Sequence, residues 1–373
     1  DLASVLYGFD DPMIEINLTP NRSDCLSIRG IARDLAAAGL GTLKELKIKK
    51  VKGSFISDIK WLREFNKDED NLCSGVSGRL FKNVQNIESP DWLKKKLISI
   101  GLRPISALVD ITNYVTHDLG RPLHVYDAEK LNGNLVMRKA KNNEKCQTLD
   151  EKEYILSDEM IVISDDTSLH GIGGVIGGLK SRCSLKTSNV FLEVALFDPI
   201  CITKTGRKLN IQSDARYRFE RGIDTSSIEW GIDIATELIM DLCGGEVSEI
   251  VTDKNDDLSL KIINYDTNLT KSLGGINIES NEQIDILEKL GFKINKLKNT
   301  NIEVTTPTFR PDIEGVADLV EEIIRIYGFD KIKPISLKRD MDLNSEFLSS
   351  AVKSFYKSKR LIANRGYFET VTW

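Results

Sequence analysis

The sequence predicts an α+β fold class distributed over several domains. The chain has 373 residues, which is too long for one compact core, so roughly two or three domains are expected. Hydrophobic residues make up 41% and charged residues 29% of the chain, as in an ordinary soluble globular protein. Strand-like and helix-like segments follow one another without strict β-α-β alternation, which favours α+β over a parallel α/β sheet.

The first segment, residues 1–72, is expected to form an N-terminal core with a peripheral region. Residues 13–18 read MIEINL and are predicted to form a strand. Residues 25–39 follow helical periodicity, and Gly39 is expected to end that helix. The stretch 41–72 is rich in lysine and then in acidic residues, with little periodicity. It is therefore predicted to be a domain boundary or a peripheral hairpin.

The second domain is expected over residues 73–252 and mixes strands with helices. Its predicted strands are 77–84 and stretches near 134–140, 159–164 and 189–197. Its predicted helices are 89–101, 105–120 and about 225–242. Ser89 is expected to cap the first of these helices, with Pro90 at the first helical position.

A smaller third domain is expected over residues 257–334, after the linker TDKNDD. Ser280 and Gln283 are expected to form a capping box. The final segment, 340–373, is predicted to carry a helix at 344–364. The predicted elements of the third domain are a strand at 260–265, helices at 280–292 and 312–328, and a hairpin of 293–297 with 302–307.

Residues 170–178 read HGIGGVIGG, an unusual concentration of glycine. A Walker phosphate loop needs Lys-Ser/Thr after the last glycine, but Leu179 and Lys180 follow here. A dinucleotide loop needs G-x-G-x-x-G before a helix, but the sixth position from Gly171 is Ile176 and the next segment resembles a strand. Two explanations remain: tight turns or bulges, or a wall where the backbone comes close to a ligand.

The net charge of −5 argues against a protein that binds nucleic acid over its whole surface. One local basic strip, residues 204–221, carries six Lys or Arg and two Asp or Glu. A solvated surface segment is the commoner explanation for such a run. The more specific explanation is that this strip contacts a nucleic acid.

The six cysteines and three histidines show no zinc-site spacing, so reduced cysteines and a cytoplasmic location are expected. No apolar run approaches the roughly 20 residues of a membrane span. No membrane association is therefore expected. The chain begins at Asp1 without an initiator methionine, which suggests a piece of a longer protein.

Glu193 is the one carboxylate within the apolar stretch VFLEVALF. It could be the solvent-facing member of an alternating strand. Its neighbours on the same face of that strand, however, are Phe191 and Ala195. A buried carboxylate is therefore favoured, and such a group needs a partner.

Four long stretches together carry a family resemblance. The stretches are EINLTPNRSDCLSIRGIARDLAAAG (15–39), LRPISALVDITNYVTHDLGRPLHVYD (102–127), SDARYRFERGID (213–224) and PTFRPDIEGVADLVEEIIRIYGFDKI (307–332). Their order and length are specific. The chain resembles the beta subunit of bacterial phenylalanyl-tRNA synthetase, over nearly its whole length and most weakly over 41–72.

The resemblance implies a partner, a substrate and a domain order. In the family, the beta subunit pairs with a catalytic alpha subunit as an (αβ)2 heterotetramer. A mixed α/β editing domain, here 73–252, hydrolyses tRNA-Phe mischarged with tyrosine, and a small winged-helix-like domain follows. The chain would lack the N-terminal OB-fold domain and the C-terminal anticodon-binding domain. Residues 340–373 would begin a truncated catalytic-like domain. No ATP site is legible here, so amino-acid activation would lie in the alpha subunit.

The resemblance also implies the residues of an editing site. Glu193 would accept the hydroxyl group of tyrosine. His124 would line the site, either as a base or as a positioning group, whereas a lone histidine is more often structural. Ser213 stands where many family members have threonine. The remaining residues assigned to the site are Thr112, Asn113, Gly173, Gly174, Gly177, Gly178 and Ala215. Basic residues assigned to tRNA contacts are Arg207, Arg216 and Arg218.

A third candidate site is acidic. Asp318, Glu321 and Glu322 have the spacing of one helix face, and Asp312 precedes them. A solvated helix face is the simple explanation. Oxygen ligands of this kind suit Mg²⁺, and the resemblance implies that these four residues bind Mg²⁺ where the alpha subunit makes contact. Two functions remain open for the chain as a whole: an editing hydrolase, or a non-catalytic scaffold for the alpha subunit and tRNA.

Overall fold

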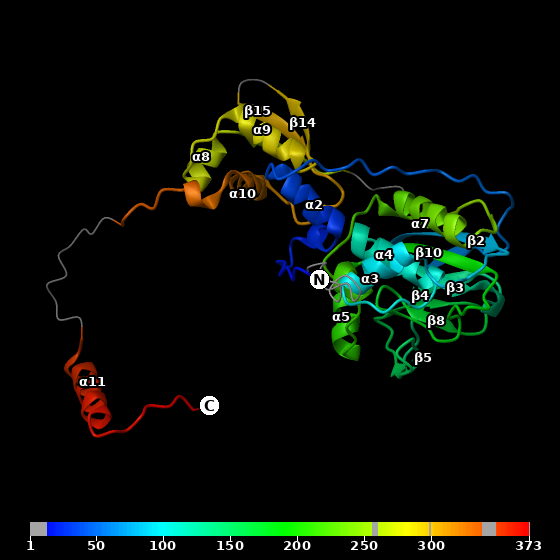
Figure 1. Ribbon diagram of the computed structural model, residues 1–373, viewed down its shortest axis with the longest axis horizontal. Coiled ribbons are helices and arrows are strands. Elements are labelled where there is room, and N and C mark those ends of the chain that lie inside the picture. Colours follow the sequence, from blue (N-terminus) through cyan, green and yellow to red (C-terminus); the bar gives the residue numbers. More distant parts are fainter. Residues whose placement is uncertain (1–12, 256–259, 298–299, 338–347, 373) are drawn as a thin grey trace, which may run out of the picture. The chain divides into compact units, whose positions relative to one another are not determined.

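The computed structural model describes residues 13–255, 260–297, 300–337 and 348–372. The chain divides into two compact units, Asp1–Lys331 and Ile332–Trp373. The first unit contains a mixed α/β domain built on two sheets and a smaller domain with a sheet of its own (Figure 1). The second unit carries one helix within its described residues, α11 (Ser350–Ala363). The predicted α+β fold class is confirmed.

Two five-stranded sheets form the mixed domain. The order of the first sheet is β1 (Trp61–Glu64), β4 (Leu135–Lys139), β7 (Ile161–Ser164), β8 (Leu169–Ile172) and β9 (Ile176–Gly177). The order of the second sheet is β11 (Glu246–Val247), β2 (Cys73–Lys82), β10 (Val190–Phe197) and β3 (His124–Asp127), and β12 (Val251–Lys254) also pairs with β2. A separate hairpin joins β5 (Lys145–Gln147) to β6 (Glu153–Ile155).

Three of the helices cover the outer face of the second sheet (Figure 1). They are α3 (Asp91–Ser99), α4 (Ala107–Leu119) and α7 (Ser227–Cys243). Two further helices follow β10 directly, α5 (Pro199–Leu209) and α6 (Asp214–Phe219). Short 3-10 turns lie at η2 (Asp70–Leu72) and η3 (Ala128–Lys130).

Strand β10 separates two hydrophobic cores, and its sequence explains why. Every residue of VFLEVALF is buried, because successive side chains point to opposite faces of a strand that is covered on both sides. Phe191 and Ala195 pack into the core shared with the first sheet. Leu192 and Val194 pack into the core beneath α4 and α7. Glu193 alternates with Leu192 and Val194, so it belongs to the inter-sheet face.

The smaller domain has a three-stranded antiparallel sheet in the order β13 (Ile262–Asp266), β15 (Asn301–Thr305) and β14 (Lys293–Lys296). The predicted hairpin of β14 and β15 is confirmed. Tyr265 is buried in this domain, where its hydroxyl bonds to Thr270 and Gln283. The remaining elements are α8 (Leu269–Gly274), α9 (Ser280–Lys289), α10 (Val316–Tyr327) and η4 (Phe329–Lys331).

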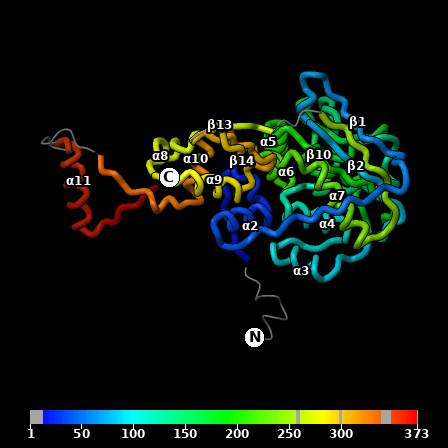
Figure 2. The backbone as a smooth tube through the Cα atoms, turned by 90° about the horizontal axis from the view of Figure 1, so that it is seen from above, coloured from blue at the N-terminus to red at the C-terminus, as the bar shows by residue number. Residues whose placement is uncertain are grey.

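The N-terminal segment joins both domains of the first unit. It consists of η1 (Ser23–Cys25) and α2 (Ile28–Ala37), and Gly39 ends the helix with a φ of 80° as expected. Helix α2 packs against α4 and lies beside α9 (Figure 2). An ion pair of 2.7 Å between Arg325 and Asp34 adds a link to α10.

Two segments differ from the sequence prediction in their strands. Residues 13–18 form no strand, because they are largely exposed and no neighbouring strand pairs with them. The predicted peripheral stretch contains β1, which pairs in parallel with β4. The predicted linker contains β12, which pairs with β2. These strands extend the sheets of the mixed domain from both of its flanks.

Two predicted helix caps are wrong for a shared reason. Pro90 itself is the N-cap of α3, and the hydroxyl of Ser89 donates instead to Asp110. Glu279 precedes α9 as its N-cap. Ser280 bonds to Thr267, while the buried Gln283 donates to backbone carbonyls. In each case a tertiary partner takes the side chain that local sequence assigns to the helix end.

Candidate functional site

A cavity of about 70 Å³ lies between the two sheets of the mixed domain, beside α6. Apolar side chains supply most of its wall, and three side chains with polar tips enter it from β3 and β10. The lining residues are Pro122, Leu123, His124, Tyr126, Ile163, Ile172, Gly174, Val175, Ile176, Gly177, Glu193, Ala195, Phe197, Ala215 and Phe219. Five residues that the sequence assigned to one site are therefore brought together, namely His124, Gly174, Gly177, Glu193 and Ala215.

The register between β3 and β10 sets the two principal polar groups on one face. Glu193 pairs directly with His124, and Phe191 pairs with Tyr126. Residues directly opposite in an antiparallel pair share a face of the sheet. His124 and Tyr126 also share a face, because they are two positions apart on β3. The histidine, the tyrosine and the glutamate thus converge on the cavity.

The Glu193 carboxyl is held in a largely apolar environment. The residue is 5% exposed, and its Oε2 accepts a short hydrogen bond from the Tyr126 hydroxyl. Burial raises the pKa of Glu193 to about 7, although the Tyr126 hydrogen bond and the charge of Arg121 oppose that rise. Within the described residues Oε1 has no hydrogen-bond partner, and the Glu193 side chain lines the cavity.

The ring of His124 is also poorly solvated. Its Nε2 is buried and has no hydrogen-bond partner within the described residues. Burial, with a smaller contribution from the nearby His170, lowers the pKa of His124 to about 4. The imidazole is therefore neutral at neutral pH. Its ring meets Tyr126 edge to face, with 4.5 Å between ring centroids.

Of the four glycines that were assigned to the cavity wall, only Gly177 lies against His124. A Cβ on Gly177 would lie 2.3 Å from Cε1 of His124. Gly174 has a φ of 66° in the turn between β8 and β9, and a Cβ there would lie 2.7 Å from Ile202. The segment thus serves both purposes considered from the sequence, a tight turn and a close approach to the cavity.

The other two glycines do not line the cavity. A Cβ on Gly173 would meet Ile161 and Phe197 at 2.9 Å, and one on Gly178 would meet the backbone of His170 at 2.7 Å. Both glycines therefore permit close packing of the first sheet.

Helix α6 closes one side of the cavity. Ser213 is its N-cap and accepts a hydrogen bond from the backbone N–H of Arg216. The Ser213 hydroxyl donates to the carbonyl of Val175 in the glycine-rich segment. Ser213 does not itself line the cavity, but this bond joins α6 to the wall and places Ala215 at its edge.

Thr112 and Asn113 are not among the residues that line the cavity. They lie on α4, on the other side of the second sheet, where the Thr112 hydroxyl donates to the carbonyl of Val109. The structure does not place them beside His124.

Sequence reasoning missed two residues beside the site. Tyr126 is fully buried and bonds to Glu193; the pattern HVY two residues after the proline could have placed it on the His124 face. Arg121 is 1% exposed and donates to the carbonyl of Ala195, with Nε and Nη1 left without partners. Burial lowers the pKa of Arg121 to about 9, so it remains charged at neutral pH.

The basic strip is divided between surface and interior. Arg207 is exposed. Arg216 is bonded to Glu220 and to the carbonyl of Ile211. Arg218 is 6% exposed and donates to the carbonyl of Leu26 and to Asp214. Of the three predicted tRNA contacts, only Arg207 is presented to solvent without such partners.

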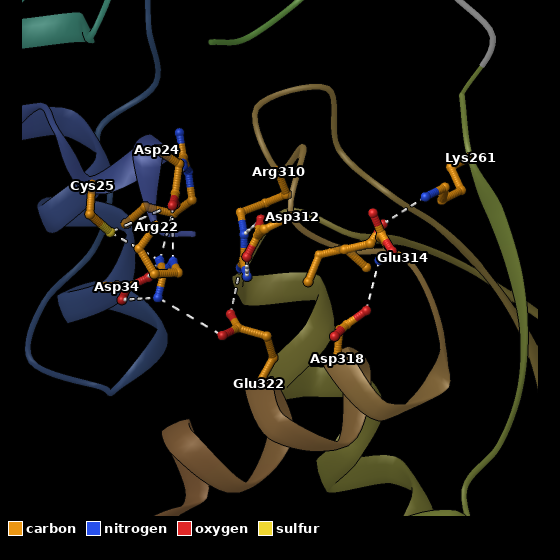
Figure 3. A network of polar contacts seen from close by, with 12 residues as sticks. Arg22, Asp24, Cys25, Asp34, Lys261, Arg310, Asp312, Glu314, Asp318 and Glu322 are labelled. Carbon is orange, nitrogen blue, oxygen red and sulfur yellow. Dashed lines mark hydrogen bonds and ion pairs between the residues drawn. The ribbon is translucent and has the colours of Figure 1, made fainter. Parts of the chain in front are cut away.

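The four acidic residues form no shared ligand group among the described residues. Figure 3 shows Asp312 and Glu322 beside Arg310, and Asp318 beside Glu314. Arg310 forms two bonds of 2.8 Å with Asp312 and reaches Glu322 as well. Asp318 accepts the backbone N–H groups of Glu314 and Gly315 at the start of α10. Glu321 is exposed.

Arginine hydrogen bonds also lower the pKa of Glu322. Glu322 is buried, yet hydrogen bonds from Arg325 and Arg310 outweigh burial and lower its pKa to about 2. The carboxylates of Asp312 and Glu322 are therefore already paired with arginine.

These side chains do not fit the predicted magnesium site. Across the described residues, the one group of metal-donor side chains close enough to share an ion is Asp24, Cys25 and Asp34. That group surrounds Arg22, which pairs with both carboxylates. The arginine supplies the positive charge that an ion would bring.

Comparison with known proteins gives two family matches. Residues 72–244 match the B3/4 domain, and residues 263–329 match the tRNA synthetase B5 domain. No helix in the described part of the chain has the length and apolarity needed to cross a membrane.

Among curated proteins, the phenylalanine–tRNA ligase beta subunit of Mesorhizobium japonicum is 48% identical over 98% of this chain and 45% of its own length. That of Brucella melitensis is 45% identical over the same shares. The chain thus spans about half the length of the curated relatives it matches. A solved N-terminal fragment of the phenylalanyl-tRNA synthetase beta subunit from Pyrococcus horikoshii aligns with 83% of this chain and 85% of that fragment, at 16% identity and a TM-score of 0.42.

Proposed function

Because the chain belongs to the phenylalanyl-tRNA synthetase beta-subunit family, we propose that its mixed domain hydrolyses Tyr-tRNA-Phe, a mischarged product. Tyrosine differs from phenylalanine by one hydroxyl group. An apolar pocket rejects an isostere that merely adds a hydroxyl by only roughly a hundredfold. A second site that selects for the hydroxyl would supply the remaining discrimination.

One observation carries this proposal: Glu193 lines an apolar cavity, and among the described residues only one of its two carboxylate oxygens has a hydrogen-bond donor. A phenol hydroxyl would donate to the other oxygen, whereas the ring of phenylalanine would leave it unpaired. A hydrogen bond to a charged group contributes about 1.5–3 kcal/mol. That range corresponds to roughly 10- to 150-fold preference for the tyrosyl ester.

The proposed reaction is attack of water on the carbonyl carbon of the aminoacyl ester. The bond from that carbon to the ribose oxygen breaks, the hydroxide stays on the acyl carbon, and the ribose oxygen takes the proton. The described residues that line the cavity include no serine, threonine or cysteine, so a covalent acyl-enzyme is not proposed.

His124 is proposed to position the water or the ester rather than to remove a proton. A general base works best when its pKa lies near the working pH, and the pKa of His124 is lowered to about 4. The unpaired Nε2 can still accept a hydrogen bond from a water molecule.

The rest of the proposal concerns the whole protein. The family resemblance supports assembly with an alpha subunit as an (αβ)2 heterotetramer, binding of tRNA-Phe and a cytoplasmic location. The alpha subunit would bind ATP and activate phenylalanine. Arg207 is the residue of the basic strip that remains proposed for a tRNA phosphate contact.

The test is deacylation of Tyr-tRNA-Phe and Phe-tRNA-Phe by the full-length beta subunit assembled with its alpha subunit. We expect wild type to prefer the tyrosyl ester and Glu193→Gln to lose that preference while both proteins bind tRNA. The matched control is Glu282→Gln, an exposed glutamate on α9. If wild type hydrolyses neither ester yet still binds tRNA and the alpha subunit, the chain is a scaffold and the proposal is wrong.

A further inference from the structure

The hydroxyl of Tyr126 occupies a position that the proposed function leaves unassigned. Tyr126 lies on β3 two residues after His124, and its register partner on β10 is Phe191. Its side chain is fully buried, yet it lines the cavity. From there its hydroxyl reaches diagonally across the strand pair to Oε2 of Glu193.

Among the described residues, Tyr126 is the one group that donates a hydrogen bond to the Glu193 carboxylate. The guanidinium of Arg121 donates its hydrogen bond of 2.6 Å to the carbonyl of Ala195. Its charge acts on Glu193 only through space. A buried carboxylate with a single donor has its orientation set by that donor. Loss of the donor would leave both the charge and the rotamer of Glu193 unsupported.

Resting on the proposed function, we infer that Tyr126 is a positioning residue for substrate selection: by bonding Oε2 of Glu193, it turns Oε1 toward the cavity as the acceptor for the substrate hydroxyl. The two oxygens of one carboxylate then take two phenol hydroxyls, one from the protein and one from the amino acid to be removed. An ionised carboxylate has enough lone pairs to accept both.

The inference makes the preference for tyrosine depend on pH. Glu193 accepts two hydroxyl donors when it is ionised, and the Tyr126 bond favours that form. The other titratable or charged groups near Glu193 are His124 on the same strand as Tyr126, His170 on β8, Cys73 on β2 and Arg121 before β3. Removal of the tyrosine hydroxyl should therefore move the midpoint of the pH dependence to a higher value.

The experiment compares kcat/KM for Tyr-tRNA-Phe and Phe-tRNA-Phe from pH 5.5 to 9 in the assembled full-length protein. We expect Tyr126→Phe to reduce the tyrosyl preference at pH 7 by about tenfold and to restore part of it at higher pH. The matched control is Tyr265→Phe, which removes another buried, hydrogen-bonded phenol hydroxyl in the smaller domain. That control should leave both the preference and its pH midpoint unchanged.

A double-mutant cycle separates this inference from the proposed function. In a Glu193→Gln background, Tyr126→Phe should cause no further loss of preference, because the carboxylate that it positions is gone. If Glu193→Gln abolishes the preference while Tyr126→Phe alters neither its size nor its pH midpoint, Tyr126 only fills space and the inference is wrong. If Glu193→Gln also leaves the preference intact, the proposed function fails with it.

Discussion

Glu193 on β10 lies directly opposite His124 on β3. This register brings an acidic and a basic side chain together without forming an ion pair, because burial raises the pKa of the acid to about 7 and lowers that of the base to about 4. Both groups are thus favoured in their neutral forms by their surroundings. The two side chains do not form a salt bridge, and both remain available to bind a polar ligand.

Replacement of Glu193 by glutamine should change how stability depends on pH. The folded pKa of about 7 lies above the ordinary value of 4.5, so the contribution of Glu193 is most favourable below the unfolded pKa. It is lost as pH rises through the folded pKa. The free energy of unfolding that Glu193 contributes therefore differs by about 3 kcal/mol between the two ends of this pH range. In urea unfolding at pH 4 and pH 8, the variant should gain about that much relative to wild type at the higher pH.

Glu282→Gln provides the comparison for this measurement, because Glu282 is exposed on α9. Equal pH dependence in wild type, Glu193→Gln and Glu282→Gln would contradict a raised pKa of Glu193 caused by burial.

His124→Ala should slow hydrolysis of Tyr-tRNA-Phe by about ten- to a hundredfold without weakening tRNA binding. Because the pKa of His124 is lowered to about 4, this residue should contribute no inflection near pH 6.5, and any inflection near pH 7 should come from Glu193 and persist in His124→Ala. Single-turnover deacylation across pH 5–8 measures both quantities. An inflection near pH 6.5 that disappears in His124→Ala would instead identify a conventional general base.

The glycines of the cavity wall should respond differently to alanine. Gly177→Ala places a methyl 2.3 Å from Cε1 of His124, so it should displace the imidazole and reduce hydrolysis. Gly178→Ala meets the backbone of His170 at 2.7 Å, so it should chiefly lower the melting temperature. Gly41→Ala enters open space and is the control, with neither effect expected. Equal behaviour of the three variants would refute this division of roles.

Two arginines of the basic strip should separate tRNA binding from stability. Arg207→Gln should reduce the slope of log affinity against log salt by somewhat less than one unit, because one phosphate contact is lost. Arg218→Gln should lower stability by about 1–3 kcal/mol, since it leaves the partly buried carbonyl of Leu26 without this donor. Filter binding at several salt concentrations, together with thermal melts, distinguishes the two. An unchanged slope for Arg207→Gln would mean that the strip is solvated surface.

Arg310→Gln should cost about 3–5 kcal/mol of stability, because Glu322 would lose a partner in a buried ion-pair network. EDTA should leave the melting temperature of wild type unchanged, since arginine supplies the countercharge. Glu321→Gln, on an exposed position of α10, should change stability by less than about 0.5 kcal/mol. A melting temperature that falls with EDTA would restore the magnesium hypothesis.

The sequence predicted what depends on local pattern. The alternation in VFLEVALF placed Glu193 on the face of Phe191 and Ala195, and the structure buries it there. Helices α3, α4, α7, α9 and α10 follow from periodicity and punctuation by glycine or proline.

What the sequence could not supply was the identity of long-range partners. Nothing local in HVYD states that β3 pairs with β10, so the bond from Tyr126 to Glu193 was invisible. The same holds for Arg310, whose neighbours Asp312 and Glu322 read from spacing alone as free carboxylates. The register of β3 with β10 decides which side chains surround Glu193. The Arg310 side chain decides that Asp312 and Glu322 are paired charges rather than metal ligands.

The flanking strands β1 and β12 carry a practical consequence for how this domain is isolated. Both lie outside residues 72–244, and they are joined through Arg63 and Asp253 at 2.9 Å. A protein cut at the family boundaries would strip β1 from β4 and β12 from β2. Two freshly exposed sheet edges would then offer unpaired N–H and C=O groups to other chains, a known route to aggregation. A fragment that begins before Phe55 and runs to Asn255 keeps β4 paired with β1 and β2 paired with β12.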